Sequence, residues 1–167
     1  MNYHNIEKYS TLNGEGIRNI LWVSGCPHAC PKCHNPQTWN PHNGITYDEM
    51  AHQELIESLS DEFVDGLTLS GGECLAPYNV ESIYNIVKEL KEIYPHLNIW
   101  IYSGYLFEQI LANEKQRQVL SMCDVLVDGK FEIAKFDKSL EWRGSSNQRV
   151  IDIKKSLELD EIVLYSK

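Results

Sequence analysis

Three cysteines within eight residues constrain this chain more than any other feature. Cys26, Cys30 and Cys33 have the spacing Cys-x3-Cys-x2-Cys, and no fourth cysteine lies near them in the sequence. Three thiolates on one short loop can bind three corners of a cubic 4Fe–4S cluster, because soft thiolates suit iron–sulfur clusters. The fourth iron would then have no protein ligand and would stay open to a small molecule. The spacing therefore predicts a cluster that takes part in chemistry rather than one that only passes electrons.

Two alternatives remain open from the cysteines alone. Zinc prefers four tetrahedral Cys or His ligands, and His28 or His34 could complete such a set. A disulfide between two of the three cysteines, with one thiol left over, is the other alternative.

Length and composition narrow the class of protein. The chain has 167 residues, 43% of them hydrophobic, which predicts one domain spanning residues 1–167 with a sizeable core. Its 24 acidic and 15 basic residues give a net charge of −9, and the largest basic cluster is the pair Lys154-Lys155. We therefore expect no nucleic-acid partner.

The sequence also gives an expectation about the cellular compartment. The first residues lack the pattern of a signal peptide, and apolar runs such as Ile20–Val23 are far too short for a membrane span. We expect a cytoplasmic protein without membrane contact, in which thiols stay reduced, and this argues against the disulfide.

Strand and helix patterns alternate along the chain. Short apolar runs predict strands at residues 19–23, 67–69, 98–102, 125–127 and 161–165. Helices are predicted from a capping box at Thr46–Glu49 to about Ser60, from Asn79 to Tyr94, and from Leu106 to Met122 with a break near Asn113. In the first helix the candidate core residues are Met50, Leu55, Ile56 and Leu59. The alternation predicts an α/β fold with a mainly parallel sheet.

Polar, glycine-containing segments follow the first four predicted strands. Because the carboxyl ends of parallel strands share one edge of a sheet, we expect these segments to face one cleft. Gly71-Gly72 would let the backbone approach a ligand closely, and Glu73 would orient an ammonium group. Tyr102 and Ser103 would offer hydroxyls to a ribose or carboxylate, and His34 would pack against a purine. Each has an ordinary alternative, namely a plain turn, a solvated carboxylate, a strand end that satisfies its own polar atoms, or a surface imidazole.

The other two cysteines are read differently. Cys74 follows Gly-Gly-Glu and is expected near the same site, although not as a cluster ligand. Cys123 ends an apolar helical stretch and is expected to be a buried, inert thiol.

Several motifs together resemble a known family. The cysteine loop with a later Gly-Gly-Glu resembles the radical S-adenosylmethionine superfamily. Within it the chain is similar to the anaerobic ribonucleotide reductase activating proteins, which generate glycyl radicals. The similarity is carried by residues 13–18, 23–26, 33–39, 69–73, 102–105, 127–131 and 142–148.

This resemblance implies a truncated, open (β/α) partial barrel of the radical S-adenosylmethionine type. It implies one 4Fe–4S cluster on Cys26, Cys30 and Cys33, with S-adenosyl-L-methionine on the fourth iron. Gly71, Gly72 and Glu73 would contact the amino end of that cofactor, and Lys32, Cys33 and His34 would line its adenosyl side.

The activity implied is reductive cleavage of S-adenosylmethionine to a 5′-deoxyadenosyl radical, which abstracts hydrogen from a glycine of the reductase. The partners implied are the large subunit of anaerobic ribonucleoside-triphosphate reductase and a reductant protein such as a flavodoxin. No side chain of this chain is expected to be a catalyst in its own right, because the cofactor carries the chemistry.

The chain departs from the family pattern at three places. Cys74 stands where proline is usual, and His34 stands where tyrosine is usual. Gly14-Glu15-Gly16 resembles 7-carboxy-7-deazaguanine synthases, which makes a radical enzyme for a small purine precursor the alternative function. For a protein partner, Trp39, Tyr105 and Trp142 are candidate docking aromatics. Arg143 is a candidate for pairing with the incoming segment, with an internal salt bridge as its alternative.

Overall fold

One open, seven-stranded sheet organises the computed structural model, which describes residues 1–167. The strand order is β3-β1-β2-β4-β5-β6-β7. The strands are β1 (Asn2–Ser10), β2 (Arg18–Val23), β3 (Ile45–Thr46), β4 (Gly66–Gly71), β5 (Asn98–Ser103), β6 (Val125–Asp128) and β7 (Arg149–Asp152). The four central strands β2, β4, β5 and β6 are parallel, whereas β1, β3 and β7 pair antiparallel with their neighbours. The α/β class is confirmed, and the sheet is mixed rather than mainly parallel.

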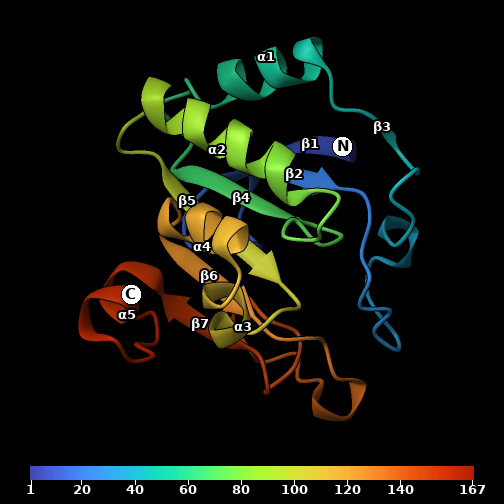
Figure 1. Cartoon of the computed structure of the whole chain (residues 1–167), viewed down its shortest axis with the longest axis vertical. Coiled ribbons are helices and arrows are strands. Elements are labelled where there is room, and N and C mark those ends of the chain that lie inside the picture. The colour runs from blue at the N-terminus through green and yellow to red at the C-terminus, as the bar shows by residue number, and fades with distance from the viewer.

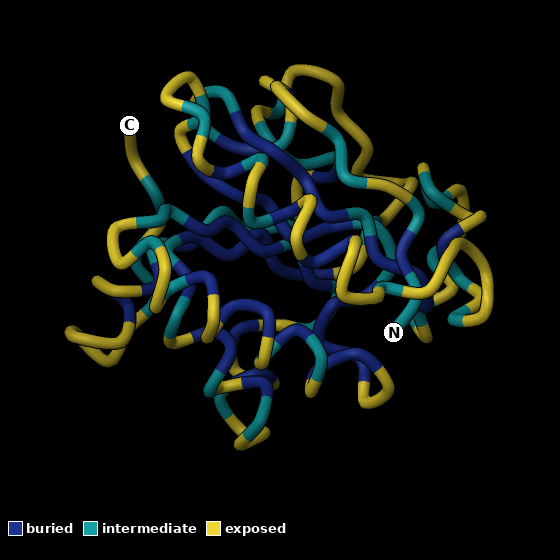
Figure 2. Tube along the Cα trace, turned by 90° about the horizontal axis from the view of Figure 1, so that it is seen from above, coloured by how far each residue is buried: buried dark blue, intermediate teal, exposed yellow.

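Helices lie along one face of this sheet (Figure 1). They are α1 (Glu49–Ser58), α2 (Val80–Ile93), α3 (Phe107–Leu111), α4 (Glu114–Ser121) and α5 (Ile153–Leu159), with short 3-10 turns η1 (Pro36–Thr38) and η2 (Ile133–Lys135). A row of fully buried side chains crosses the four parallel strands on the helix-covered face, made of Leu21, Leu69, Ile101 and Leu126. Figure 2 shows the strands as the buried centre of the molecule and the connecting loops as its exposed margin.

The next residue of each strand points to the opposite face, because side chains alternate along a strand. This second row consists of Trp22, Ser70, Tyr102 and Val127, and all four line one cavity. One face of the sheet thus holds the helices and the other forms a cavity wall.

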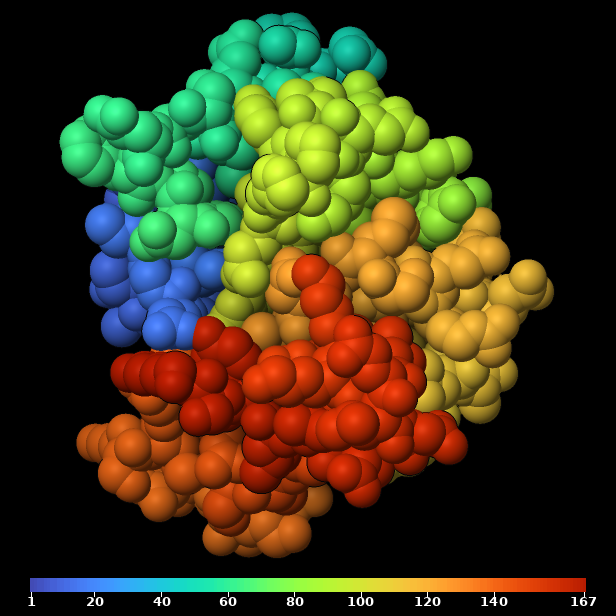
Figure 3. Space-filling view, turned by 90° about the vertical axis from the view of Figure 1, so that its left-hand side faces the viewer, coloured from blue at the N-terminus to red at the C-terminus, as the bar shows by residue number.

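The C-terminal segment packs against the residues before β2, at the end of the central strands that lies away from this cavity. Arg18, at the start of β2, is 2% exposed and donates to the carbonyls of Leu67 and Asn98, at distances of 2.8 and 3.0 Å. The Tyr165 hydroxyl bonds the Glu15 carboxylate, and its ring packs edge-to-face on Trp100. Figure 3 shows the C-terminal segment, in red, against the N-terminal strands, in blue. None of the helices combines the length and the apolar character that a membrane crossing requires.

Several predicted elements have different details. The first helix is capped by Asp48, whose side chain accepts from the Ala51 N–H at 2.9 Å, and not by Thr46. Met50 is 81% exposed, because it lies on the outer face of α1, whereas Leu55 and Leu59 are buried as predicted. The break at Asn113 is confirmed, since Asn113 caps α4 through its side chain. The predicted strand at 161–165 is only a single bridge between Leu164 and Ile151.

Candidate functional site

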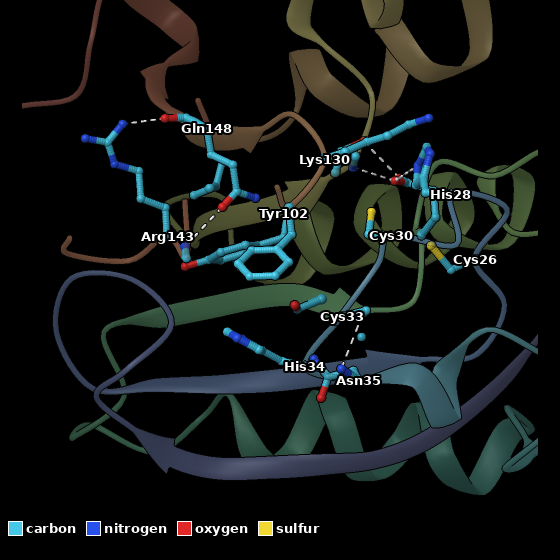
Figure 4. A pocket seen from close by; sticks show the side chains of 18 of the residues that line it. Cys26, His28, Cys30, Cys33, His34, Asn35, Tyr102, Lys130, Arg143 and Gln148 are labelled. Carbon is cyan, nitrogen blue, oxygen red and sulfur yellow. Dashed lines mark hydrogen bonds and ion pairs between the residues drawn. The ribbon is translucent and has the colours of Figure 1, made fainter. Parts of the chain in front are cut away.

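A cavity of about 370 Å³ opens at the carboxyl ends of the parallel strands (Figure 4). The segments that follow β2, β4, β5 and β6 all contribute to its lining, as the strand pattern predicts. From these segments the lining residues include Cys26, Cys30, Cys33, Gly72, Glu73, Gly104 and Gly129. The three cysteines and the polar strand ends are therefore parts of one site.

The cysteine loop begins at a constrained backbone position. Gly25 has φ +96° and donates its N–H to the Thr38 carbonyl at 2.6 Å, and the Cys26 N–H donates to the Trp39 carbonyl at 3.0 Å. A Cβ at position 25 would lie 2.5 Å from the Tyr78 ring, so glycine is required there. These contacts fix where the loop leaves the sheet.

All three thiols are free and partly exposed to the cavity. Burial raises the pKa of the Cys26 thiol to about 11. Burial also raises the pKa of the Cys30 thiol, against the lowering effects of the Phe131 N–H and the Lys130 charge. The Cys33 sulfur accepts the Asn35 N–H at 3.4 Å. In the metal-free chain the Cys26 and Cys30 thiols are protonated at neutral pH, so metal binding must release their protons.

Gly71-Gly72 fits against the start of the cysteine loop. Gly71 has φ +107°, and a Cβ there would lie 2.6 Å from the backbone of Val23, while a Cβ on Gly72 would lie 2.4 Å from the Gly25 carbonyl oxygen. The close backbone approach expected of this motif is thus made to the protein itself. The pair aligns the end of β4 with the loop that carries Cys26.

Glu73 has its hydrogen-bonding capacity filled by the protein. The carboxylate is 1% exposed and accepts from His28 Nε2 (2.8 Å), the Leu75 N–H (3.0 Å), the Ser103 hydroxyl (2.9 Å) and the Gly104 N–H (2.7 Å). A carboxylate has about four acceptor positions. The prediction that Glu73 orients an ammonium group finds no free acceptor position in this arrangement.

The hydroxyls of Tyr102 and Ser103 are also used internally. The Tyr102 hydroxyl donates to the Trp142 carbonyl at 2.6 Å, and burial raises its pKa. The Ser103 hydroxyl donates to Glu73 and accepts the Tyr105 N–H at 3.1 Å. Both residues line the cavity, but their hydroxyls follow the ordinary alternative of a strand end that satisfies its own polar atoms.

The two neighbours of the third cysteine, Lys32 and His34, have different surroundings. Lys32 is exposed with φ +59° and does not line the cavity. His34 lines the cavity and packs against Phe131, with ring centroids 4.9 Å apart. His34 and Phe131 together therefore form an aromatic part of the cavity wall.

The predicted docking residues lie mostly within the fold. Trp142 packs on Trp100, with ring centroids 5.0 Å apart, and Tyr105 packs on His28 at 4.6 Å. Trp39 is half-buried. Arg143 makes no salt bridge; it donates to the Gln148 carbonyl and lines the cavity.

Two residues that sequence reasoning missed are central to the site. His28, considered only as a zinc ligand, binds Glu73. Asn79 does not cap α2 with its side chain; its buried amide donates to the carbonyls of Ser24 (2.9 Å) and Glu73 (3.0 Å). A hydrogen-bond partner distant in sequence leaves no local signal, so these roles were visible only in the fold.

Cys74 and Cys123 point away from the cavity into the main core. Both are fully buried, and burial raises the pKa of each thiol. Cys74 adjoins the site through its backbone but does not face it. No three His, Cys, Asp or Glu side chains converge on one point in this arrangement, and this holds for the three loop cysteines as well as for any set of zinc ligands.

Comparison with known families gives the class of protein that this fold and cavity define. The family described as "4Fe-4S single cluster domain" matches residues 12–151, which include the cysteine loop and every strand that lines the cavity. The match favours an iron–sulfur cluster over zinc.

Relatives then narrow the family. Proteins named anaerobic ribonucleoside-triphosphate reductase-activating protein are 42% identical in Pasteurella multocida, 43% in Enterobacteria phage T4 and 41% in Escherichia coli K12. The alignments cover 89–90% of this chain and 93–97% of those relatives. The chain belongs to the family of anaerobic ribonucleoside-triphosphate reductase-activating proteins.

Proposed function

We propose that this chain activates an anaerobic ribonucleotide reductase through radical S-adenosylmethionine chemistry. Cys26, Cys30 and Cys33 would hold one 4Fe–4S cluster, and S-adenosyl-L-methionine would occupy the cavity beside it. When bound and reduced, these groups would supply reductive cleavage of S-adenosylmethionine to methionine and a 5′-deoxyadenosyl radical, which would take hydrogen from a glycine of the reductase large subunit. A protein such as a flavodoxin would donate the electron. The observation that carries this proposal is a cavity lined by the three thiols and by all four parallel-strand ends.

The residues present fit such a group. Three soft thiols that line one cavity suit an iron–sulfur cluster. The Phe131 N–H donates to the Cys30 sulfur, and the Asn35 N–H donates to the Cys33 sulfur. The row Trp22, Tyr102 and Val127 would limit water in the cavity, and His34 with Phe131 would flank an adenine.

The amino end of the cofactor would lie at Gly71 and Gly72. Because Glu73 is saturated, we assign this contact to backbone carbonyls and give Glu73 the role of fixing the strand ends. Lys32 would act at the outer edge of the adenosyl side. We also propose that the whole chain, residues 1–167, is one domain and that its open sheet is a truncated partial (β/α) barrel of the radical S-adenosylmethionine type.

The names of the relatives favour a reductase over a purine precursor as the substrate. Gly14 packs on Arg18 and Trp100, where a Cβ would lie 2.7 Å from the Arg18 Cδ, so packing accounts for this glycine. The relatives matched over 93–97% of their length carry the reductase-activating name.

The test is single replacement of Cys26, Cys30 or Cys33 by Ala, with Cys123→Ala as the matched control. After anaerobic loading with iron and sulfide, the three variants should lose the cluster and the cleavage of S-adenosylmethionine, whereas Cys123→Ala should keep both. Electron paramagnetic resonance of a mixture with the reductase and a reductant should show a glycyl radical only with the wild type and the control.

Three results would contradict the proposal. One is a Cys123 as essential as Cys30, another is stoichiometric zinc, and the third is turnover of a purine precursor without a protein partner.

A further inference from the structure

His28 lies midway between Cys26 and Cys30, and its side chain turns inward. The side chain is 6% exposed, and Nε2 donates to a Glu73 carboxylate oxygen at 2.8 Å (Figure 4). Its ring packs edge-to-face on Tyr105, with centroids 4.6 Å apart. The same ring covers Gly104, where a Cβ would lie 2.4 Å from His28 Cδ2. One imidazole therefore contacts the segments that follow both β4 and β5.

Few other hydrogen bonds hold this part of the loop: the Cys30 carbonyl accepts the Cys33 N–H at 3.1 Å, and the Phe131 N–H bonds the Cys30 sulfur. Between residues 27 and 32 no backbone N–H donates to a backbone carbonyl, and Pro27 and Pro31 have no N–H to donate. Pro27, Ala29, Pro31 and Lys32 are all exposed. His28 is the one side chain of the segment between Cys26 and Cys30 that enters the protein.

Glu73 makes a rigid anchor for this side chain. The carboxylate is held by Leu75, Ser103 and Gly104 through three further hydrogen bonds. Ser103 ends β5, Gly104 follows it directly, and Leu75 lies in the turn that follows β4. A bond from His28 to this carboxylate therefore ties the loop to the sheet rather than to another loop.

We propose that His28 is a positioning residue, which braces the loop between Cys26 and Cys30 against the ends of β4 and β5. The brace keeps the two flanking thiols in their places on the cavity wall. It also explains why the segment after β5 carries glycine at position 104, since any side chain there would expel the imidazole. The consequence for a bound cluster rests on the proposed function, whereas the consequence for the loop itself does not.

Four variants of the full chain test the brace. His28→Ala removes it, and His28→Gln keeps a donor near the Nε2 position. Gly104→Ala should displace the ring without touching the loop sequence. His52→Ala is the matched control, because His52 is also buried and bonds a glutamate, Glu89, at 2.7 Å, but joins α1 to α2 outside the cavity lining.

The first readout is the rate at which iodoacetamide alkylates Cys26 and Cys30 in the cluster-free chain at one pH, resolved by tandem mass spectrometry. We expect His28→Ala and Gly104→Ala to raise it about tenfold or more, the effect of losing a hydrogen bond to a charged group. His28→Gln should restore most of the wild-type rate, and His52→Ala should leave it unchanged. A wild-type rate in His28→Ala, or an equal rise in His52→Ala, would overturn the proposal.

The second readout is iron release to a chelator after anaerobic cluster loading, together with the paramagnetic signal of the reduced cluster. Iron release should quicken, and the signal should broaden, in His28→Ala and Gly104→Ala but not in His28→Gln. Stoichiometric zinc in the wild type that His28→Ala loses would make His28 a ligand and overturn the brace. If Cys30→Ala retains as much iron as the wild type, the proposed function fails, and the alkylation rates still decide whether His28 braces the loop.

Discussion

Cys74 and Cys30 carry the same thiol in opposite surroundings. Cys74 is fully buried in the main core with its Sγ directed at the Ser70 carbonyl, 3.8 Å away, whereas Cys30 is partly exposed at the cavity. Cys74→Ala should lower the free energy of unfolding by about 1 kcal/mol, because it removes one buried heavy atom from a packed site. Cys30→Ala should leave the unfolding free energy of the cluster-free chain nearly unchanged.

For the amount of bound cluster, we expect the larger effect from Cys30→Ala and the smaller one from Cys74→Ala. Cys74→Ala should bind iron as the wild type does, and Cys30→Ala should not. Urea denaturation and iron analysis measure the two effects, and a Cys74→Ala chain that folds but loses iron would make Cys74 a ligand.

The raised pKa of Cys26 gives a pH dependence. Burial raises this pKa to about 11, so the thiolate, which is the reactive form, grows about tenfold per pH unit until the pH nears that value. Alkylation of Cys26 in the cluster-free chain should therefore rise through pH 7, 8 and 9 without levelling off. An unperturbed thiol levels off once the pH exceeds its own pKa of about 8.5. A plateau near pH 9, measured by mass spectrometry of the Cys26 site, would show that burial does not control this thiol.

At this scale the sequence predicted which residues line the site better than it predicted what they do. The cysteines, Gly71, Gly72 and Glu73 were found because they share a motif or follow a strand. The saturation of Glu73 could not be foreseen, since His28, Ser103 and Gly104 are far from it in the sequence. The internal partners of the Tyr102 and Ser103 hydroxyls, the Trp142 carbonyl and Glu73, could not be foreseen for the same reason.

Two glycines with similar backbone angles differ at the scale of elements. Gly71 ends β4 with φ +107° and has the Val23 backbone within 2.6 Å of its missing Cβ, whereas Gly129 follows β6 with φ +94° and has its nearest atom 3.6 Å away. Gly71→Ala should lower the free energy of unfolding by about 3 kcal/mol or more, from the left-handed backbone and the clash together. Gly129→Ala should cost only about 1–2 kcal/mol, from the backbone alone.

Thermal or urea denaturation of the two variants checks this difference. Gly71→Ala should also impair iron binding, since β4 and the start of the cysteine loop would move apart. Equal costs for the two substitutions would mean that the β2–β4 contact at Val23 is looser than the structure has it.

Helices were predicted from sequence more successfully than outer strands. The 3.6-residue pattern of Val80, Ile83, Val87 and Leu90 marks α2 clearly, and all four are buried. β1 was missed because its residues are mostly polar and its side chains are largely half-exposed. β7 and α5 were missed because each is short and lies in a polar tail.

In the whole molecule, the candidate site and the residues that stabilise the sheet lie at opposite ends of the central strands. The cavity lies at the carboxyl ends, while Arg18 closes the amino ends, with donors to Thr68 Oγ1 (2.8 Å) and to the carbonyls of Glu15, Leu67 and Asn98. Arg18→Met should lower the free energy of unfolding by about 3 kcal/mol or more, because each buried acceptor left unpaired costs about 1–3 kcal/mol.

The folded Arg18→Met fraction should nevertheless bind iron normally. Arg117→Met is the control, because Arg117 makes one exposed bond to the Leu111 carbonyl and should cost under about 0.5 kcal/mol. Loss of iron binding in folded Arg18→Met, measured below its melting temperature, would show that the two ends of the sheet are coupled.

The overall architecture was predictable only for the middle of the chain. Alternating strands and helices from β2 to β6 give the parallel centre, because that connection forces parallel neighbours. The antiparallel outer strands β1, β3 and β7 join the sheet without a strand–helix–strand connection to their neighbours. No periodic sequence pattern predicts such strands. The mixed sheet therefore emerged only in three dimensions.

The alternation of the two side-chain rows has a consequence for design. Trp22, Ser70, Tyr102 and Val127 form the cavity wall. The residue before each of them in its strand points to the opposite face of the sheet and packs against the helices. A combinatorial library at these four positions would vary the shape and polarity of the chamber and leave the packing beneath the helices in place. Substitutions at these four positions should therefore change the size of ligand that the cavity accepts without changing the helix-packed core.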